Sequence, residues 1–168
     1  VLATVPSASR SDLDAALNAA RSGFPDEVYD WLWEHFGMET PRILDVGCGT
    51  GALLAQLRDE GCRVFGLEYA AAGRNMCHKR GLEVRPFDIT LDNFEAEQPY
   101  DVVVSMEVAE HLPEPAADRY IELLSHLGRN IVFTAATPGQ GGTGHVNEQP
   151  HEYWINKFAH RDRILDWT

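Results

Sequence analysis

Short apolar runs alternate with helix-like segments over residues 42–135, and this alternation constrains the fold more than any other feature of the sequence. Helical patterns at about 51–60, 70–80 and 116–127 each end at a glycine. Strands that alternate with helices favour βαβ units and a parallel sheet, and continuous apolar strands favour helices on both faces. We therefore predict a doubly wound α/β fold with its ligand at the carboxyl ends of the strands. The predicted strands are 42–46, 63–68, 83–86, 101–106 and 130–135.

Two more helices are predicted ahead of the first strand, at residues 11–22 and 25–37. A chain of 168 residues with 44% apolar residues is long enough for one hydrophobic core. We expect residues 1–40 to form an N-terminal helical cap or lid and residues 41–168 to form the ligand-binding domain.

The composition narrows the range of partners. The formal net charge is −12 and basic residues form no run, which disfavours a nucleic acid and favours a small neutral or cationic molecule. No apolar stretch reaches the roughly 18 residues that a membrane span needs. The three cysteines have no metal-binding or disulfide spacing, so we expect free thiols in a reducing, cytoplasmic environment.

A glycine-rich turn, Asp45-Val46-Gly47-Cys48-Gly49-Thr50-Gly51, follows the first predicted strand. Glycines let the backbone approach a ligand closely, and the start of the next helix adds free N–H groups. Asp45 would repel a phosphate but attract a cationic amine, which favours S-adenosylmethionine, with its ammonium and sulfonium groups, over a dinucleotide. Because the turn also fits the GxGxxG/A pattern, an NAD-binding site remains an alternative.

Acidic residues also follow the next two strands. Glu68 ends the second strand, 23 residues after Asp45, where a carboxylate can accept hydrogen bonds from both ribose hydroxyls. Asp88 follows the third strand and is predicted either to accept from an adenine amino group or to cap a loop.

These residues resemble the motifs of class I S-adenosylmethionine-dependent methyltransferases, of the ubiquinone-type (Methyltransf_23-like) group. Residues 43–51 resemble motif I, and residues 100–107 resemble the fourth strand of such enzymes. The resemblance implies a Rossmann-like, doubly wound, mostly parallel sheet over residues 41–168, and we expect it to lack the usual C-terminal antiparallel hairpin. The cofactor-binding residues that it implies are Asp45, Gly47, Cys48, Gly49, Gly51, Glu68, Tyr69, Asp88, Ile89, Met106 and Glu107.

The segment Glu107-Val108-Ala109-Glu110-His111 resembles two subgroups, the ubiquinone-type O-methyltransferases and the small-RNA 2′-O-methyltransferases. In these a Glu-x-x-Glu-His segment can bind a divalent metal with a further histidine. The implied ligands of Mg²⁺ or a similar ion are Glu107, Glu110, His111 and His145, with His151 as another candidate. In the alternative interpretation Glu107 lies near the cofactor while Glu110 and His111 only pack or cap.

The catalytic prediction is methyl transfer to an oxygen or nitrogen of a small molecule. His111, with help from Glu107, is the predicted general base, because histidine exchanges protons near neutral pH. His145, Asn147 and Tyr153 are expected to line the acceptor pocket. The alternatives are an NAD(P)-binding oxidoreductase, a non-catalytic cofactor- or partner-binding domain, and metal-assisted RNA 2′-O-methylation.

Overall fold

A five-stranded sheet in the order β3-β2-β1-β4-β5 forms the centre of the computed structural model, which describes residues 40–163. Every strand pairing in this sheet is parallel. The strands are β1 (Arg42–Val46), β2 (Arg63–Glu68), β3 (Val84–Pro86), β4 (Tyr100–Met106) and β5 (Gly128–Thr134). The helices are α3 (Ala52–Asp59), α4 (Ala71–Lys79), α5 (Ala117–Leu127) and α6 (His151–Ala159), with short 3-10 turns η1 (Ala109–His111) and η2 (Glu114–Ala116).

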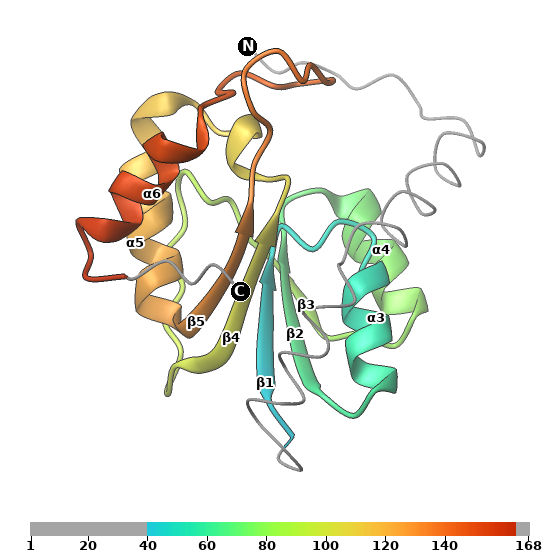
Figure 1. Ribbon diagram of the computed structural model, residues 1–168. Coiled ribbons are helices and arrows are strands. Elements are labelled where there is room, and N and C mark those ends of the chain that lie inside the picture. The colour runs from blue at the N-terminus through green and yellow to red at the C-terminus, as the bar shows by residue number, and fades with distance from the viewer. Residues whose placement is uncertain (1–39, 164–168) are drawn as a thin grey trace.

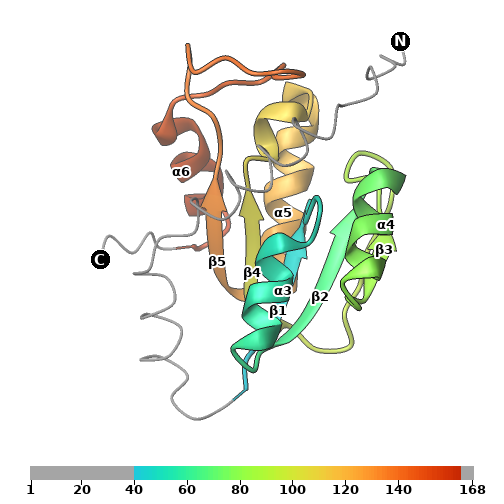
Figure 2. The ribbon, with the colours of Figure 1, turned by 90° about the vertical axis from the view of Figure 1, so that its right-hand side faces the viewer.

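Helices cover both faces of the sheet, with α3 and α4 on one side and α5 and α6 on the other (Figures 1 and 2). Successive residues of a strand point to opposite faces, so each strand contributes to two cores. Leu44 and Val103 pack in the core that contains the buried side of α5. Ile43 and Val102 pack with Leu57 of α3 in the other. The predicted doubly wound α/β architecture is therefore confirmed.

Helix α5 forms because its apolar residues recur at helical spacing. Its buried residues share one face, which lies against the sheet; they are Ala117, Tyr120, Ile121, Leu124 and Leu127. Helix α6 adds Trp154 and Phe158, whose rings lie 5.4 and 5.2 Å from the ring of Phe133 on β5. These contacts close the sheet face at its β5 edge.

The predicted element boundaries need one correction. Gly128 was expected to end the helix over residues 116–127, with a strand only from residue 130. Gly128 does end α5 as its C-cap, but it has an extended φ of −124° and already pairs with Tyr100, so β5 begins there rather than at residue 130. The backbone is close to Val103 at this position, since an added Cβ would lie 2.6 Å from its Cγ2.

Some predictions concern residues outside the described range of 40–163. They are the helices at 11–22 and 25–37, with the N-terminal cap that they would form. Within the described range none of the helices combines the length and apolar character that crossing a membrane requires.

The strand order creates one switch point. From β1 the chain runs outward to β2 and β3, and it then returns to β4 on the other side of β1 before reaching β5. The loops after β1 and β4 therefore leave in opposite directions, which opens a crevice at their carboxyl ends.

Candidate functional site

A pocket of about 410 Å³ lies at the carboxyl ends of the strands around this switch point. Its volume falls within the range of about 300–1,000 Å³ that is common for small-molecule sites. The predicted site residues that line it are Gly47, Glu68, Tyr69, Asp88, Ile89, Glu107 and His111. The sequence motifs after four different strands thus meet at one pocket.

The glycine turn after β1 is tied to the end of β2. The backbone N–H groups of Gly47 and Cys48 donate to the Leu67 carbonyl, with N···O distances of 2.8 and 3.2 Å. Gly47 has φ +85°, and an added Cβ would lie 2.5 Å from Cγ2 of Val108. Only glycine fits this position without strain. The turn ends at Gly51, the N-cap of α3, so the free N–H groups of that helix begin beside the pocket.

The Glu68 carboxylate is held by two backbone N–H groups, one in the glycine turn and one just before α4. Oε2 accepts from Gly49 N at 2.7 Å, and Oε1 accepts from Ala70 N at 2.6 Å. A carboxylate has about four acceptor positions, so Glu68 can still accept two ribose hydroxyls. This buried side chain is a preorganised acceptor at the pocket wall.

Asp45 lies behind the pocket wall, at the end of β1, and is almost fully buried. Burial and the negative charge of Glu68 raise the pKa of Asp45 to about 7. The Glu68 carboxylate therefore opposes the ionisation of Asp45 under the glycine turn. A bound cation would relieve this repulsion; that Asp45 holds the amine of a ligand stays a prediction.

Asp88 caps its own loop. Its Oδ1 accepts from the backbone N and the hydroxyl of Thr90, at 2.8 and 2.6 Å. Oδ2 lies outside these two bonds. The guanidinium of Arg119 on α5 reinforces the loop by donating to Thr90 O and Asn93 Oδ1, both at 3.1 Å. The capping role of Asp88 is therefore present, and the same side chain also lines the pocket.

Four other predicted cofactor residues do not line the pocket; they are Cys48, Gly49, Gly51 and Met106. The Cys48 thiol is buried in the core with Leu54 and Cys77, and burial raises its pKa, so it is a neutral packing group. Met106 packs against the core beside α3. Gly49 presents its backbone N–H to Glu68. Any contact of Cys48 with a ligand therefore comes from its backbone.

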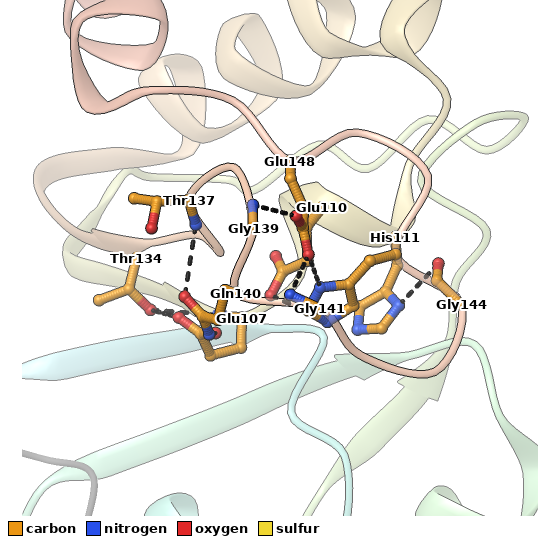
Figure 3. Close-up of polar contacts among 11 residues, drawn as sticks. Glu107, Glu110, His111, Thr134, Thr137, Gly139, Gln140, Gly141, Gly144 and Glu148 are labelled. Atoms are coloured by element: carbon orange, nitrogen blue, oxygen red, sulfur yellow. Dashed lines mark hydrogen bonds and ion pairs between the residues drawn. The ribbon is translucent and has the colours of Figure 1, made fainter.

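Glu107 begins the loop after β4 with an unusual backbone. Its φ is +53°, in the left-handed region that non-glycine residues rarely adopt. Its backbone N donates to the Thr134 carbonyl oxygen at 3.2 Å, and the Thr134 hydroxyl donates to Glu107 Oε1 at 2.8 Å. Gln140 Nε2 donates to Oε2 at 3.4 Å. The carboxylate is thus held toward β5 and the loop that follows it (Figure 3).

His111 lines the pocket and has a defined hydrogen-bond partner. Its Nδ1 lies 3.2 Å from the Gly144 carbonyl oxygen. A carbonyl oxygen only accepts, so Nδ1 must carry the proton in the neutral ring. This leaves Nε2 with the lone pair that a general base needs.

Glu110 is the most unusual side chain of the site. It is fully buried, and neither carboxylate oxygen has a hydrogen-bond partner among the described residues. Burial raises its pKa, and the charge of Glu107 raises it further. Its Oε1 lies 4.0 Å from Nε2 of His145.

The predicted metal ligands come together only in part. Glu110, His111 and His145 each offer a donor atom, and these atoms lie within 4.8 Å of one another. The unpartnered carboxylate of Glu110 fits a cation, whereas Glu107 is turned toward Thr134 and does not join this group. The role of Glu107 as a further ligand stays a prediction. His151 does not belong to the group either.

The structure places Asn147 and Tyr153 away from the pocket at the strand ends, and their role as acceptor residues stays a prediction. Asn147 is buried, and its Oδ1 accepts from Gln149 Nε2 at 2.9 Å. Tyr153 packs edge-on against Trp154, with Lys157 above its ring. Neither residue lines the pocket of about 410 Å³.

Sequence reasoning missed Val108, Arg119 and Glu148. Val108 packs on Gly47, Arg119 holds the Asp88 loop, and Glu148 pairs with His145. The signal for Val108 was its place within the Glu107–His111 segment. Isolated charged residues such as Arg119 and Glu148 carry no sequence signal, because their roles arise from tertiary contacts.

Comparison with known proteins identifies relatives of one kind. A family model described as a methyltransferase domain matches residues 14–149. The ubiquinone biosynthesis O-methyltransferase of Bordetella parapertussis is 35% identical over 127 residues, which cover 71% of this chain and 50% of that protein. The enzyme of the same name from Stutzerimonas stutzeri is 32% identical over 94 residues, or 52% of this chain and 40% of that protein. The chain thus spans half or less of the length of these two curated relatives.

Solved structures show the same fold at low identity. The magnesium protoporphyrin IX methyltransferase from Synechocystis PCC 6803, with bound SAH, has a TM-score of 0.68 at 17% identity and covers 94% of this chain and 78% of that chain. A TehB-like SAM-dependent methyltransferase from Corynebacterium glutamicum has a TM-score of 0.65 at 18% identity, with 90% and 80% covered.

Proposed function

The chain belongs to the class I S-adenosylmethionine-dependent methyltransferases, and from this we propose that it methylates an oxygen of a small-molecule acceptor. The observation that carries the proposal is a single pocket with Glu68 and His111 on its wall. Glu68 suits the ribose of the cofactor, and His111 suits the removal of a hydroxyl proton. The names of the curated relatives, which are O-methyltransferases, support oxygen rather than nitrogen as the acceptor atom.

The cofactor end of the pocket would be held by backbone and carboxylates. Glu68 would accept the ribose hydroxyls, Asp88 Oδ2 the adenine amino group, and Asp45 with the glycine turn the ammonium group. Ile89 and Tyr69 offer apolar surface to the adenine ring. When bound, the cofactor supplies a methyl group on a sulfonium with a neutral leaving group, so the main task of the protein is to align the acceptor and exclude water.

The acceptor end would use His111. In the Nδ1–H form its Nε2 can take the hydroxyl proton of the acceptor as the methyl group is transferred. Such a group contributes about 10²- to 10⁴-fold in rate. Glu107 lies on the same wall, but its carboxylate is held by Thr134 and Gln140, so the help to His111 that is predicted for it would require the carboxylate to turn away from these partners.

A divalent cation is a second candidate at this end. The buried, unpartnered carboxylate of Glu110 and the imidazoles of His111 and His145 form a donor set of one oxygen and two nitrogens. Carboxylate and imidazole suit several divalent ions. These three residues would hold the ion, which would lower the pKa of the acceptor hydroxyl.

The net charge of −12 favours a small acceptor over RNA. The acidic pair under the glycine turn opposes a pyrophosphate, which disfavours NAD(P). The alternative of a non-catalytic domain makes a different prediction, since it would bind cofactor without turnover.

The proposal is tested by methyl transfer from radiolabelled S-adenosylmethionine to a panel of phenols, catechols and amines. We expect transfer to a phenolic hydroxyl, and a loss of about 10²-fold or more in His111→Gln. The control is His126→Gln, which changes an exposed histidine on α5 and should keep full activity. Loss of activity on chelation, restored by Mg²⁺ or Mn²⁺, would support the cation. No transfer to any acceptor, with intact cofactor binding, would support the non-catalytic alternative.

A further inference from the structure

The loop between β5 and α6 folds back onto itself around one carboxylate. Oε2 of Glu148 accepts from Gly139 N at 2.9 Å, and Oε1 accepts from Gly141 N at 2.7 Å (Figure 3). Oε1 also lies 2.8 Å from Nδ1 of His145. A carboxylate is ordinarily ionised near neutral pH. An ionised carboxylate only accepts, so Nδ1 of His145 donates.

His145 and the residue before it contact His111, so the position of His145 affects that of His111. The two rings meet edge to face, with 4.9 Å between their centroids. Gly144, the residue before His145, places its carbonyl oxygen 3.2 Å from Nδ1 of His111. A movement of His145 would therefore shift both the ring that contacts His111 and the carbonyl that accepts its proton. Gly142 leaves the space for this arrangement, because an added Cβ there would collide with the His145 ring.

A separate anchor ties the same loop to η1. The backbone N–H groups of Val146 and Asn147 donate to the Glu110 carbonyl oxygen at 2.8 and 3.0 Å. These bonds involve no atom of the Glu148 side chain. Loss of the carboxylate should therefore loosen the placement of His145 and Gly144 without releasing the whole loop.

We propose that Glu148 is a positioning residue that fixes the tautomer and orientation of His111, acting through His145 and the Gly144 carbonyl. The ionised carboxylate orients His145, and His145 and Gly144 together hold His111 with its proton on Nδ1 and its lone pair on Nε2. A buried or oriented imidazole commonly has its tautomer set by the bond that its other nitrogen makes. The proposal rests on the proposed function insofar as His111 is the base for methyl transfer.

The first test is spectroscopic and needs no acceptor. The side-chain nitrogens of His111 are observed by NMR in ¹⁵N-labelled protein at a pH where the ring is neutral. We expect the wild type to show the Nδ1–H form and Glu148→Ala to show a mixture of tautomers. Glu148→Gln keeps one acceptor oxygen and should lie between the two. A His111 spectrum that is identical in the wild type and in both variants would overturn the proposal.

The second test is kinetic. We expect kcat to fall about tenfold or more in Glu148→Ala, less in Glu148→Gln, and the affinity for S-adenosylhomocysteine to change less than twofold. Glu152→Ala, which alters an exposed glutamate in the first turn of α6, is the matched control and should change neither. A changed His111 spectrum with unchanged kcat would also overturn the positioning role. Absence of turnover by the wild type with every acceptor would contradict the proposed function alone, because the NMR comparison would still decide the placement of His111.

Discussion

Asp45 and Glu68 place two carboxyl groups under one glycine turn, and we expect this to make cofactor binding sensitive to pH. Burial and the charge of Glu68 raise the pKa of Asp45 to about 7, well above the ordinary aspartate pKa of about 3.9. The ionised form is the one that attracts an ammonium group. Below pH 7 the free protein therefore carries a proton that binding must expel.

Cofactor affinity should consequently fall as the pH falls below about 7, by up to roughly tenfold per pH unit. Calorimetric titration with S-adenosylhomocysteine between pH 5.5 and 7.5 measures this slope. Asp45→Asn removes the titrating group, so it should bind more weakly at pH 7.5 and lose the slope. An equally steep slope in Asp45→Asn would assign the effect to another group.

The pKa shift also has a consequence for stability, whose sign is opposite to that of a salt-bridged carboxylate. The folded protein holds the Asp45 proton up to about pH 7, whereas the unfolded chain releases it near pH 4. The contribution of Asp45 to the free energy of unfolding therefore decreases as the pH rises from 4 to 7.

A substitution at Gly47 tests the packing of the glycine turn against Val108. Gly47→Ala should lower the free energy of unfolding through its φ of +85° and through the contact with Val108. The φ alone costs about 1–2 kcal/mol. Gly61→Ala is the control, because Gly61 has φ +97° and nothing within 4 Å of an added Cβ, so only the backbone cost applies. In urea unfolding we expect Gly47→Ala to lose more than Gly61→Ala, and Val108→Ala to recover part of the difference. Equal losses in the two glycine variants would contradict the contact.

Single residues differ in how far the sequence could predict them. The turn glycines, Asp45 and Glu68 stand at fixed places relative to strand ends, where the backbone alone sets their position. Glu148 could not be predicted, because its partners Gly139, Gly141 and His145 are chosen by the path of an irregular loop. Glu107 lines the pocket as expected, but the direction of its carboxylate toward Thr134 depends on a left-handed backbone conformation. No feature of the sequence predicts that conformation.

At the scale of elements, apolar periodicity predicted the strands and helices whose side chains pack in the core. Strands β1 and β2 match their predicted ranges; β1 is buried after its first residue, and β2 is buried over its last three residues. The predicted start of β5 was two residues too late. A glycine after a helix indicates only where the helix ends, whereas the pairing of Gly128 with Tyr100 also makes it the first residue of the strand. Loops were the least predictable, as the Asp88 loop illustrates. Its shape depends on Arg119, which is 29 residues away from Thr90 in sequence.

Substitution of Arg119 therefore tests whether a contact from α5 holds the shape of the Asp88 loop. Arg119→Ala removes the donors to Thr90 and Asn93, and the loosened loop should weaken S-adenosylhomocysteine binding about three- to tenfold. Arg119→Lys should recover little of the affinity, because one ammonium group cannot reproduce the planar fork. The control Arg129→Ala changes an exposed arginine on β5 and should bind normally by calorimetry. Normal affinity in Arg119→Ala would show that the loop holds its shape without this clamp.

For the whole molecule, the strand order explains why distant motifs share one pocket. The carboxyl ends of β1 and β4 are neighbours only because the chain leaves β1 toward β3 and returns to the opposite side. The site is thus a property of topology, and it brings together Glu68, Asp88 and His111 from three separate segments. Proteins of the same fold with 17–18% sequence identity include one with bound SAH.

The central claim is that this pocket binds S-adenosylmethionine through Glu68, and calorimetric titration tests it most directly. The protein is titrated with S-adenosylhomocysteine and, in parallel, with NADH; Glu68→Ala and the exposed-site control Glu122→Ala are titrated alongside. We predict micromolar binding of S-adenosylhomocysteine by the wild type and by Glu122→Ala, a loss of at least tenfold in Glu68→Ala, and no binding of NADH. Binding of NADH alone, or unchanged S-adenosylhomocysteine affinity in Glu68→Ala, would contradict the account.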